Sequence, residues 1–150
     1  MNVIRQLLAA ACLWTGLAFA AANAQTATIF SDDFQSGSYA GWTMSGTGND
    51  ALNTYLGNSS LRHDGLRQAT RSLSSQGYTG VSLSIDVAAL YLVNGDYCYA
   101  EYSTNGGAGW SSLVLVGDGA GIGALKHGTI ATGLDNNPNL RVRFRAYTLY

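Results

Sequence analysis

The feature that most restricts the fold of this chain is a two-residue periodicity that recurs in short segments after residue 25. In the clearest segment, Leu140 to Ala146, apolar residues at every second position alternate with three arginines. Because successive side chains of a β-strand point to opposite faces of a sheet, this pattern predicts a strand with one face in a core. No long segment after residue 25 has the 3.6-residue periodicity of an amphipathic helix. Short alternating segments between glycine- and asparagine-rich turns indicate a β-sandwich or barrel.

Several further segments have the composition or alternation of strands. We expect strands at Thr26 to Phe30, Trp42 to Met44, Ser60 to Arg62, Gln68 to Leu73, Val81 to Val87, Asp96 to Ser103, Trp110 to Val116, Leu125 to Ala131 and Leu140 to Ala146. The Asp-Gly pair in His63-Asp64-Gly65 predicts a hairpin turn, because these residues tolerate the positive φ angles of tight turns.

The N-terminus has the three regions of a secretory signal. Arg5 is followed by the uncharged apolar run Leu7 to Ala20, and Ala22-Asn23-Ala24 supplies the small residues that signal peptidase requires. The apolar run is shorter than the about 20 residues that cross a bilayer. We therefore predict a signal peptide over residues 1–24, a single domain over residues 25–150, no membrane insertion after cleavage, and a secreted or periplasmic location.

Loss of Arg5 with the leader leaves seven Lys and Arg residues against nine Asp and Glu, a net charge of −2. Such a chain has no basic field to attract a phosphate backbone, so we expect no nucleic-acid partner. Cys98 is the one cysteine after the leader, which precludes an internal disulfide. A nucleophilic cysteine needs a histidine base, and His63 and His127 lie in no recognisable motif, so a buried or unpaired thiol is the favoured interpretation.

Several segments, in order along the chain, resemble a known group of domains. They are Phe30 to Phe34 with Gly41-Trp42, Ser60-Leu61-Arg62 with Gly65, Ala69-Thr70-Arg71, Gly77-Tyr78 leading into Val81 to Asp86, Asp96 to Ser103, and Asn136 to Leu140 running into Arg143-Phe144-Arg145. Together they resemble the MAM-like and concanavalin-like jelly-roll modules of secreted bacterial proteins. The resemblance implies an all-β, antiparallel two-sheet jelly-roll sandwich, a non-catalytic role, and in some members a structural calcium ion near the N-terminal acidic segment.

Two features depart from the family pattern. Gln35 stands where the family commonly has an acidic residue, and the chain stops at Tyr150, before a last strand that carries an aspartate and sometimes a cysteine. The resemblance therefore implies a chain that lacks its last strand, a calcium site short of ligands, and a Cys98 without its partner.

Asp32 and Asp33 are the candidate metal ligands, and Ca²⁺ is the predicted cofactor. Calcium takes about 6–8 oxygen ligands, of which two aspartates supply only a part. Neighbouring residues of a strand also point to opposite faces, so the alternative is an Asp-rich turn at the end of the first strand.

The segment Ser103 to Trp110 resembles an Asp-box turn, with Asn105 in the position of the aspartate and Gly109 in that of the threonine. Propeller glycosidases carry repeated copies of this motif on several blades, whereas this chain has one. We interpret it as a hairpin cap in which side-chain acceptors bind turn amides and Trp110 packs on the turn.

The candidate ligand-binding residues are Tyr97, Tyr99 and Glu101, which share one face of a predicted strand. Exposed tyrosine and tryptophan rings stack on the apolar faces of sugars. Arg141, Arg143 and Arg145 form a second row, which would recognise acidic polymers through bidentate contacts or, as we favour, form a solvated face paired with Asp or Glu across strands.

These patterns predict a secreted, non-catalytic binding or accessory module with an extracellular polysaccharide or protein as its partner. One alternative is a small glycoside-acting hydrolase that uses an inward carboxylate pair such as Asp86 and Glu101. Another is a truncated structural fragment without a ligand of its own. The chain has no Gly-x-Ser-x-Gly or His-Glu-x-x-His motif, and we expect no enzymatic activity.

Overall fold

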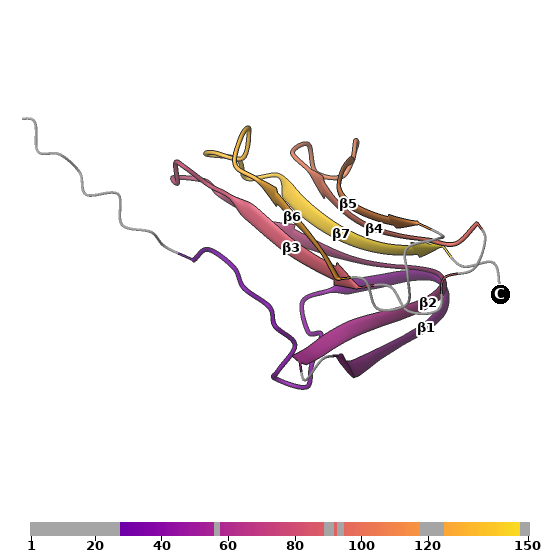
Figure 1. Ribbon diagram of the computed structural model, residues 1–150. Coiled ribbons are helices and arrows are strands. Elements are labelled where there is room, and N and C mark those ends of the chain that lie inside the picture. The colour runs from indigo at the N-terminus through magenta and orange to yellow at the C-terminus, as the bar shows by residue number, and fades with distance from the viewer. Residues whose placement is uncertain (1–27, 56–57, 89–91, 93–94, 118–124, 148–150) are drawn as a thin grey trace, which may run out of the picture.

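The computed structural model describes residues 28–55, 58–88, 92, 95–117 and 125–147, which form seven β-strands and no helix (Figure 1). The strands are β1 (Thr43–Tyr55), β2 (Asn58–Leu73), β3 (Leu83–Ala88), β4 (Tyr97–Ser103), β5 (Ser111–Gly117), β6 (Leu125–Ile130) and β7 (Leu140–Tyr147). Within these ranges, no helix is long and apolar enough to cross a membrane. The predicted signal peptide lies outside the described residues.

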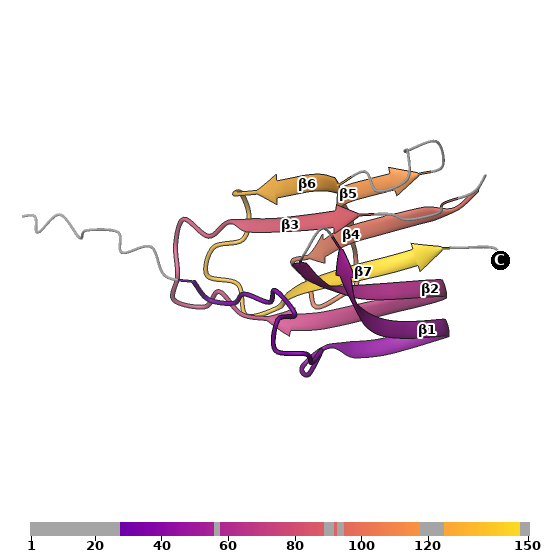
Figure 2. The ribbon, with the colours of Figure 1, turned by 60° about the horizontal axis from the view of Figure 1, so that its bottom comes forward.

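The strands are arranged in two antiparallel sheets, a five-stranded sheet in the order β1-β2-β7-β4-β5 and a two-stranded sheet of β3 and β6. The small sheet packs on one face of the large one (Figure 2), where Ile85 of β3 contacts a core that includes Ala100, Val114 and Val142. The predicted fold class, an all-β antiparallel two-sheet sandwich, is confirmed.

Alternation along β7 and β4 divides the large sheet into two chemically different faces. Val142 and Ala146 of β7 are buried on the inner face, toward β3 and β6, as the periodicity predicts. We call the opposite side the outer face. Its residues include Thr43 and Ser45 of β1, Gln68, Thr70 and Ser72 of β2, Arg141, Arg143 and Arg145 of β7, and Tyr97, Tyr99 and Glu101 of β4.

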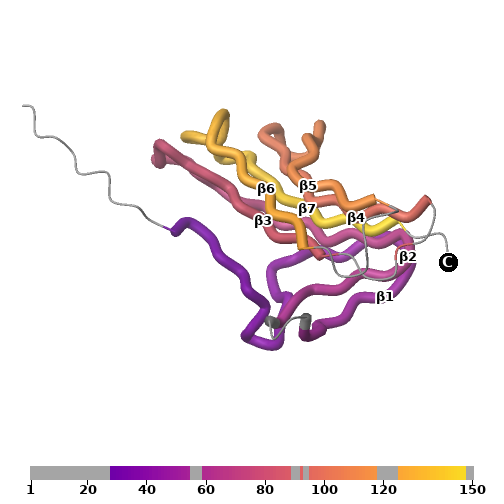
Figure 3. Tube along the Cα trace, in the orientation of Figure 1, coloured from indigo at the N-terminus to yellow at the C-terminus, as the bar shows by residue number. Residues whose placement is uncertain are grey.

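The predicted turn at His63-Asp64-Gly65 is wrong, because these residues lie inside the continuous strand β2. The hairpin instead closes where Tyr55 pairs with Asn58. Gly65 pairs with Gly48, and both have positive φ angles, +78° and +133°. These glycines let the paired strands bend together, and Figure 3 shows the resulting curl of β1 and β2 away from the rest of the sheet.

The strand predicted at Thr26 to Phe30 is also wrong for its described part, since residues 28–30 belong to no strand. This segment contributes side-chain packing instead. Trp42 lies with its ring centroid 6.3 Å from that of Phe30, 6.1 Å from Phe34 and 5.3 Å from Phe144 on the inner face of β7. The N-terminal segment therefore covers part of the large sheet beside β3 and β6.

Candidate ligand-binding face

The three residues predicted as a binding site lie together on the outer face. Alternation along β4 places Tyr97, Tyr99 and Glu101 on the same side, and the ring centroids of the two tyrosines are 6.1 Å apart. The pairing of β4 with β7 sets Tyr99 opposite Arg145 and Glu101 opposite Arg143. The predicted tyrosine row and the predicted arginine row are thus adjacent rows of one surface.

Glu101 is buried beneath the arginines rather than exposed for contact with a ligand. It is 7 % exposed and accepts a 2.8 Å hydrogen bond from Nε of Arg143 and a 3.3 Å bond from Nη2 of Arg145. Charge-assisted bonds of this kind orient guanidinium groups strongly. The favoured prediction for the arginine row was a solvated face paired with acidic residues across strands. The pairing is confirmed for Arg143 and Arg145, but the Arg143 side chain is only 16 % exposed and is not solvated as predicted.

Both of these arginines also lie over aromatic rings. The guanidinium carbon of Arg143 is 4.0 Å from the ring centroid of Trp110, and that of Arg145 is 4.4 Å from the ring centroid of Tyr99. Guanidinium planes stack favourably on aromatic faces. Each arginine is therefore held by a carboxylate and by a ring, and each ring has a cation on one of its faces.

Trp110 is positioned by the turn that the sequence identifies as Asp-box-like. Ser103 Oγ accepts a 2.9 Å hydrogen bond from the amide of Gly107, and Asn105 Oδ1 accepts a 2.8 Å bond from the amide of Gly109. Gly107 has a φ of +92°, which favours glycine in this turn, and a Cβ built on it would be in ordinary van der Waals contact with Cζ2 of the indole. The prediction of a hairpin cap is confirmed, and its consequence is a fixed indole at the rim of the outer face.

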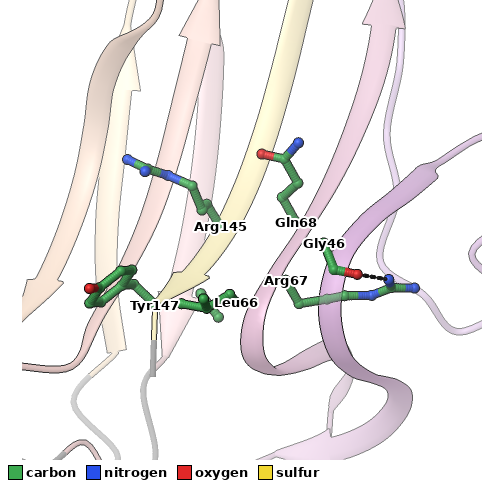
Figure 4. A pocket seen from close by; sticks show the side chains of 7 residues that line it. Gly46, Leu66, Arg67, Gln68, Arg145 and Tyr147 are labelled. Carbon is green, nitrogen blue, oxygen red and sulfur yellow. Dashed lines mark hydrogen bonds between the residues drawn. The ribbon is translucent and has the colours of Figure 1, made fainter. Parts of the chain in front are cut away.

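The outer face contains two hollows that share one residue. The larger hollow has a volume of about 440 Å³, and its lining includes Trp110, Arg141, Arg143, Thr70, Ser72 and Gln68. The smaller hollow has a volume of about 290 Å³, and its lining includes Gln68, Arg145, Leu66 and Tyr147. Figure 4 shows Leu66 beside Tyr147 in the smaller hollow. Since Gln68 belongs to both, the two hollows are neighbours on one surface.

Arg141 differs from the other two arginines because it makes no hydrogen bond or ion pair to the described part of the chain. It is exposed at the rim of the larger hollow, where it pairs in register with Ser72. The three arginines and Glu101 together carry a charge of +2, whereas the whole chain has a net charge of −1. The outer face is therefore locally basic on an acidic protein.

The predicted metal ligands bind donors of the protein itself. Asp32 Oδ2 accepts a 2.8 Å hydrogen bond from the indole of Trp42, and its Oδ1 accepts a 3.0 Å bond from the amide of Phe34. Asp33 accepts a 3.0 Å bond from the amide of Gln35. The described residues include no group of three or more His, Cys, Asp or Glu side chains placed to hold a metal ion. Calcium binding by Asp32 and Asp33 stays a prediction.

The carboxylate pair of the hydrolase alternative is not brought together. Ile85 points from β3 into the core, so its neighbour Asp86 points away from the large sheet, where it contacts His127 at 2.7 Å. Glu101 points outward from the opposite layer. The two carboxylates thus lie on opposite outer surfaces of the sandwich.

One cluster was missed by the sequence analysis, which interpreted His63 as part of a turn. Nδ1 of His63 lies 2.7 Å from Oδ1 of Asp50, and Nε of Arg67 donates a 2.7 Å bond to Oδ2 of the same aspartate. The hydrogen bond from Arg67 lowers the pKa of Asp50, while burial lowers the pKa of His63. Asp50 and His63 meet because they pair across the long hairpin of β1 and β2. The sequence analysis did not predict this hairpin, so it did not bring the two residues together.

Cys98 packs on the inner face against the core, and within the described residues it is a free thiol. Burial, with a smaller contribution from the charge of Asp96, raises the pKa of this thiol to about 11. A thiol protonated at neutral pH is a poor nucleophile. Cys98 is partly buried and, within the described residues, unpaired, which agrees with the favoured interpretation of a buried or unpaired thiol.

Comparison with known proteins adds no identity to this picture. No protein-family model matches the chain, and a search of curated proteins finds no match.

Proposed function

We propose that this chain is a secreted or periplasmic, non-catalytic module that binds an extracellular polysaccharide on the outer face of its five-stranded sheet. The observation that carries the proposal is the pair of neighbouring hollows that share Gln68. Two hollows in a row suit a linear polymer, which needs successive subsites rather than one closed pocket. Secretion rests on the signal-like residues 1–24.

The chemistry of the lining supports a sugar ligand. Sugars combine apolar C–H faces with a rim of hydroxyl groups, so their sites combine aromatic surface with hydrogen-bonding side chains. The larger hollow has the Trp110 ring together with Thr70, Ser72 and the amide of Gln68. The smaller hollow adds the exposed side chains of Leu66 and Tyr147.

The hydrolase alternative requires a pair of carboxyl groups in one site, which a binding role does not. Glycoside hydrolysis by the usual route needs two carboxyl groups that flank one bond, roughly 5–10 Å apart. Asp86 and Glu101 lie on opposite outer surfaces of the sandwich, and Glu101 is engaged by two arginines. No specific observation therefore favours that alternative.

Replacement of Trp110 by alanine tests the proposal. The purified protein is run through native gels that contain neutral or acidic polysaccharides, and retardation is measured against the same gel without polymer. We expect the wild type to be retarded by at least one polymer and Trp110→Ala to bind it about tenfold more weakly, because the variant loses an aromatic contact of the larger hollow. Tyr78→Ala is the matched control, because Tyr78 is an exposed ring in the loop after β2 and lines neither hollow.

A second variant keeps the test decisive if Trp110→Ala does not fold. Ser72 is exposed and lines the larger hollow, so Ser72→Ile fills part of that space and removes a hydroxyl, while isoleucine suits a strand. Absence of retardation by every polymer, or full retardation of a folded Ser72→Ile variant, contradicts the proposal. Binding of a protein partner at the same face would replace polysaccharide as the ligand.

A further inference from the structure

We infer that the ligand of the outer face is an anionic polysaccharide whose carboxylate groups are bound by Arg141 and Arg143 at the Trp110 end of the larger hollow. This inference rests on the proposed function, because it names the class of polymer that the same surface binds. The sequence analysis favoured a solvated arginine row. The geometry of the three arginines separates their roles and leads to this assignment.

Arg141 and Arg143 have more N–H donors than the described residues use. A guanidinium group has five N–H donors and no acceptor. Nε and Nη2 of Arg143 approach the same oxygen of Glu101 at 2.8 Å, which leaves Nη1 without a hydrogen bond to the described residues. Arg141, which pairs in register with Ser72, donates no hydrogen bond to the described residues. The larger hollow therefore has charged donors that the described residues leave free to bind the acceptors of a ligand.

The arginine row gives the outer face a local positive charge. Glu101 neutralises only one of the three arginines, so these four side chains retain a charge of +2 within a chain of net charge −1. The net negative charge of the whole chain would repel an acidic polymer. Local complementarity at the outer face is thus the physical basis for binding, and it weakens as salt screens the charges.

Two arginines of the row lie on aromatic rings. Arg143 covers one face of Trp110 and Arg145 covers one face of Tyr99, at 4.0 and 4.4 Å. The guanidinium occupies one face of each ring, so a sugar can stack only on the ring surface that remains. On each covered face, a ligand meets a guanidinium that is held flat against the ring and fixed by Glu101. Such a guanidinium is suited to bidentate pairing with a carboxylate.

The test compares two polymers that differ only in charge. Polygalacturonate carries a carboxylate on each residue, and its methyl ester has the same backbone with the charge removed. We expect affinity electrophoresis and titration calorimetry at low salt to show at least about tenfold tighter binding of polygalacturonate or of a second polyuronate, alginate, than of the ester. Binding should weaken as salt is raised.

Substitutions of exposed arginines locate the effect. Arg141→Ala should weaken polyuronate binding about fivefold or more, and Arg141→Lys should restore only part of the loss because an ammonium group lacks the bidentate fork. Arg62→Ala is the matched control, since Arg62 is exposed on the curled part of the hairpin, where it pairs with Asp64. Both sites are exposed, so folding should be unchanged, and thermal unfolding checks this.

Three results overturn the inference. Equal binding of the ester and the acid, with both lost in Trp110→Ala, leaves the proposed function intact and removes the anionic ligand. An equal loss of binding in Arg62→Ala and Arg141→Ala would show that the polymer is held by general electrostatic attraction and not by a specific site on the outer face. Absence of binding to either polyuronate overturns the inference, and absence of binding to neutral polymers as well overturns the proposed function with it.

Discussion

At the scale of single residues, the Asp50–His63–Arg67 cluster makes the stability of the protein depend on pH. The side chains of His63 and Asp50 are 6 % and 7 % exposed, and Asp50 is held ionised by Arg67. We assign the Nδ1–H tautomer to His63, because Nδ1 then donates to Asp50. Its Nε2 is buried and has no hydrogen-bond partner among the described residues, so a second proton there would be poorly solvated.

The stability of the protein should therefore fall as the pH is lowered from 7.5 to 5. Burial lowers the pKa of His63 below its usual value of 6.5, so in this range the unfolded chain binds a proton that the folded protein does not. Asp50, whose pKa is also lowered, adds a further loss only below about pH 4. Thermal unfolding across the range should show a falling midpoint in the wild type and a flatter profile in His63→Gln.

His127→Gln is the control for this experiment, because it removes an exposed histidine from β6. It should keep the wild-type profile. A profile that flattens in His127→Gln and not in His63→Gln would show that burial of His63 does not control the pH dependence.

The sequence correctly predicts on which face of a strand the candidate ligand-binding side chains lie, but it does not predict how deeply they are buried. Alternation along β4 correctly placed Tyr97, Tyr99 and Glu101 on one face. It did not show that Glu101 is buried, because its cover comes from Arg143 and Arg145 on a strand that is distant in sequence. Side-chain depth depends on such cross-strand neighbours, which a period-two pattern does not identify.

At the scale of elements, the bent hairpin of β1 and β2 depends on its glycines. A Cβ built on Gly48 would lie 1.8 Å from the carbonyl oxygen of Asp64, so any side chain at this position forces the two strands apart. The backbone at Gly48 has a φ of +133°, which residues with a side chain rarely adopt.

Gly48→Ala should therefore lower the free energy of unfolding by about 3 kcal/mol or more, since it combines a clash with backbone strain. Gly77→Ala separates these two causes. Gly77 has a φ of +82° and open space around it, so its substitution should cost about 1–2 kcal/mol from strain alone. Chemical denaturation of both variants measures the difference, and equal losses would mean that the close approach at Gly48 has no energetic role.

The elements also show why turns were harder to predict than strands. The strand at Leu140 to Ala146 was predicted almost to its ends, because a core on one side and solvent on the other impose strict alternation. The Asp-Gly pair at Asp64-Gly65 was interpreted as a turn, although it lies within β2 opposite Gly48. Residues with positive φ angles occur both in hairpin turns and in bent strands. Only the register of the partner strand distinguishes the two structures.

At the scale of the whole molecule, the two layers of the sandwich are unequal. The small sheet of β3 and β6, with the segment that contains Trp42, covers the inner face of the large sheet. The outer face has no such cover in the described structure, yet it contains the buried Glu101, the ring-stacked Arg143 and Arg145, and both hollows. Ordered polar and aromatic groups on an uncovered face are the basis of the claim that this face binds the ligand.

Chemical-shift mapping by NMR tests that claim most directly. The ¹⁵N-labelled protein is titrated with short oligogalacturonates, and the shifts of backbone amides are followed to saturation. We predict that the largest changes fall on the outer face, at Ser72, Gly107, Trp110 and Arg141, with small changes at Asp86 and His127 on the opposite surface. Changes confined to β3 and β6, or no saturable change at any amide, would contradict the account.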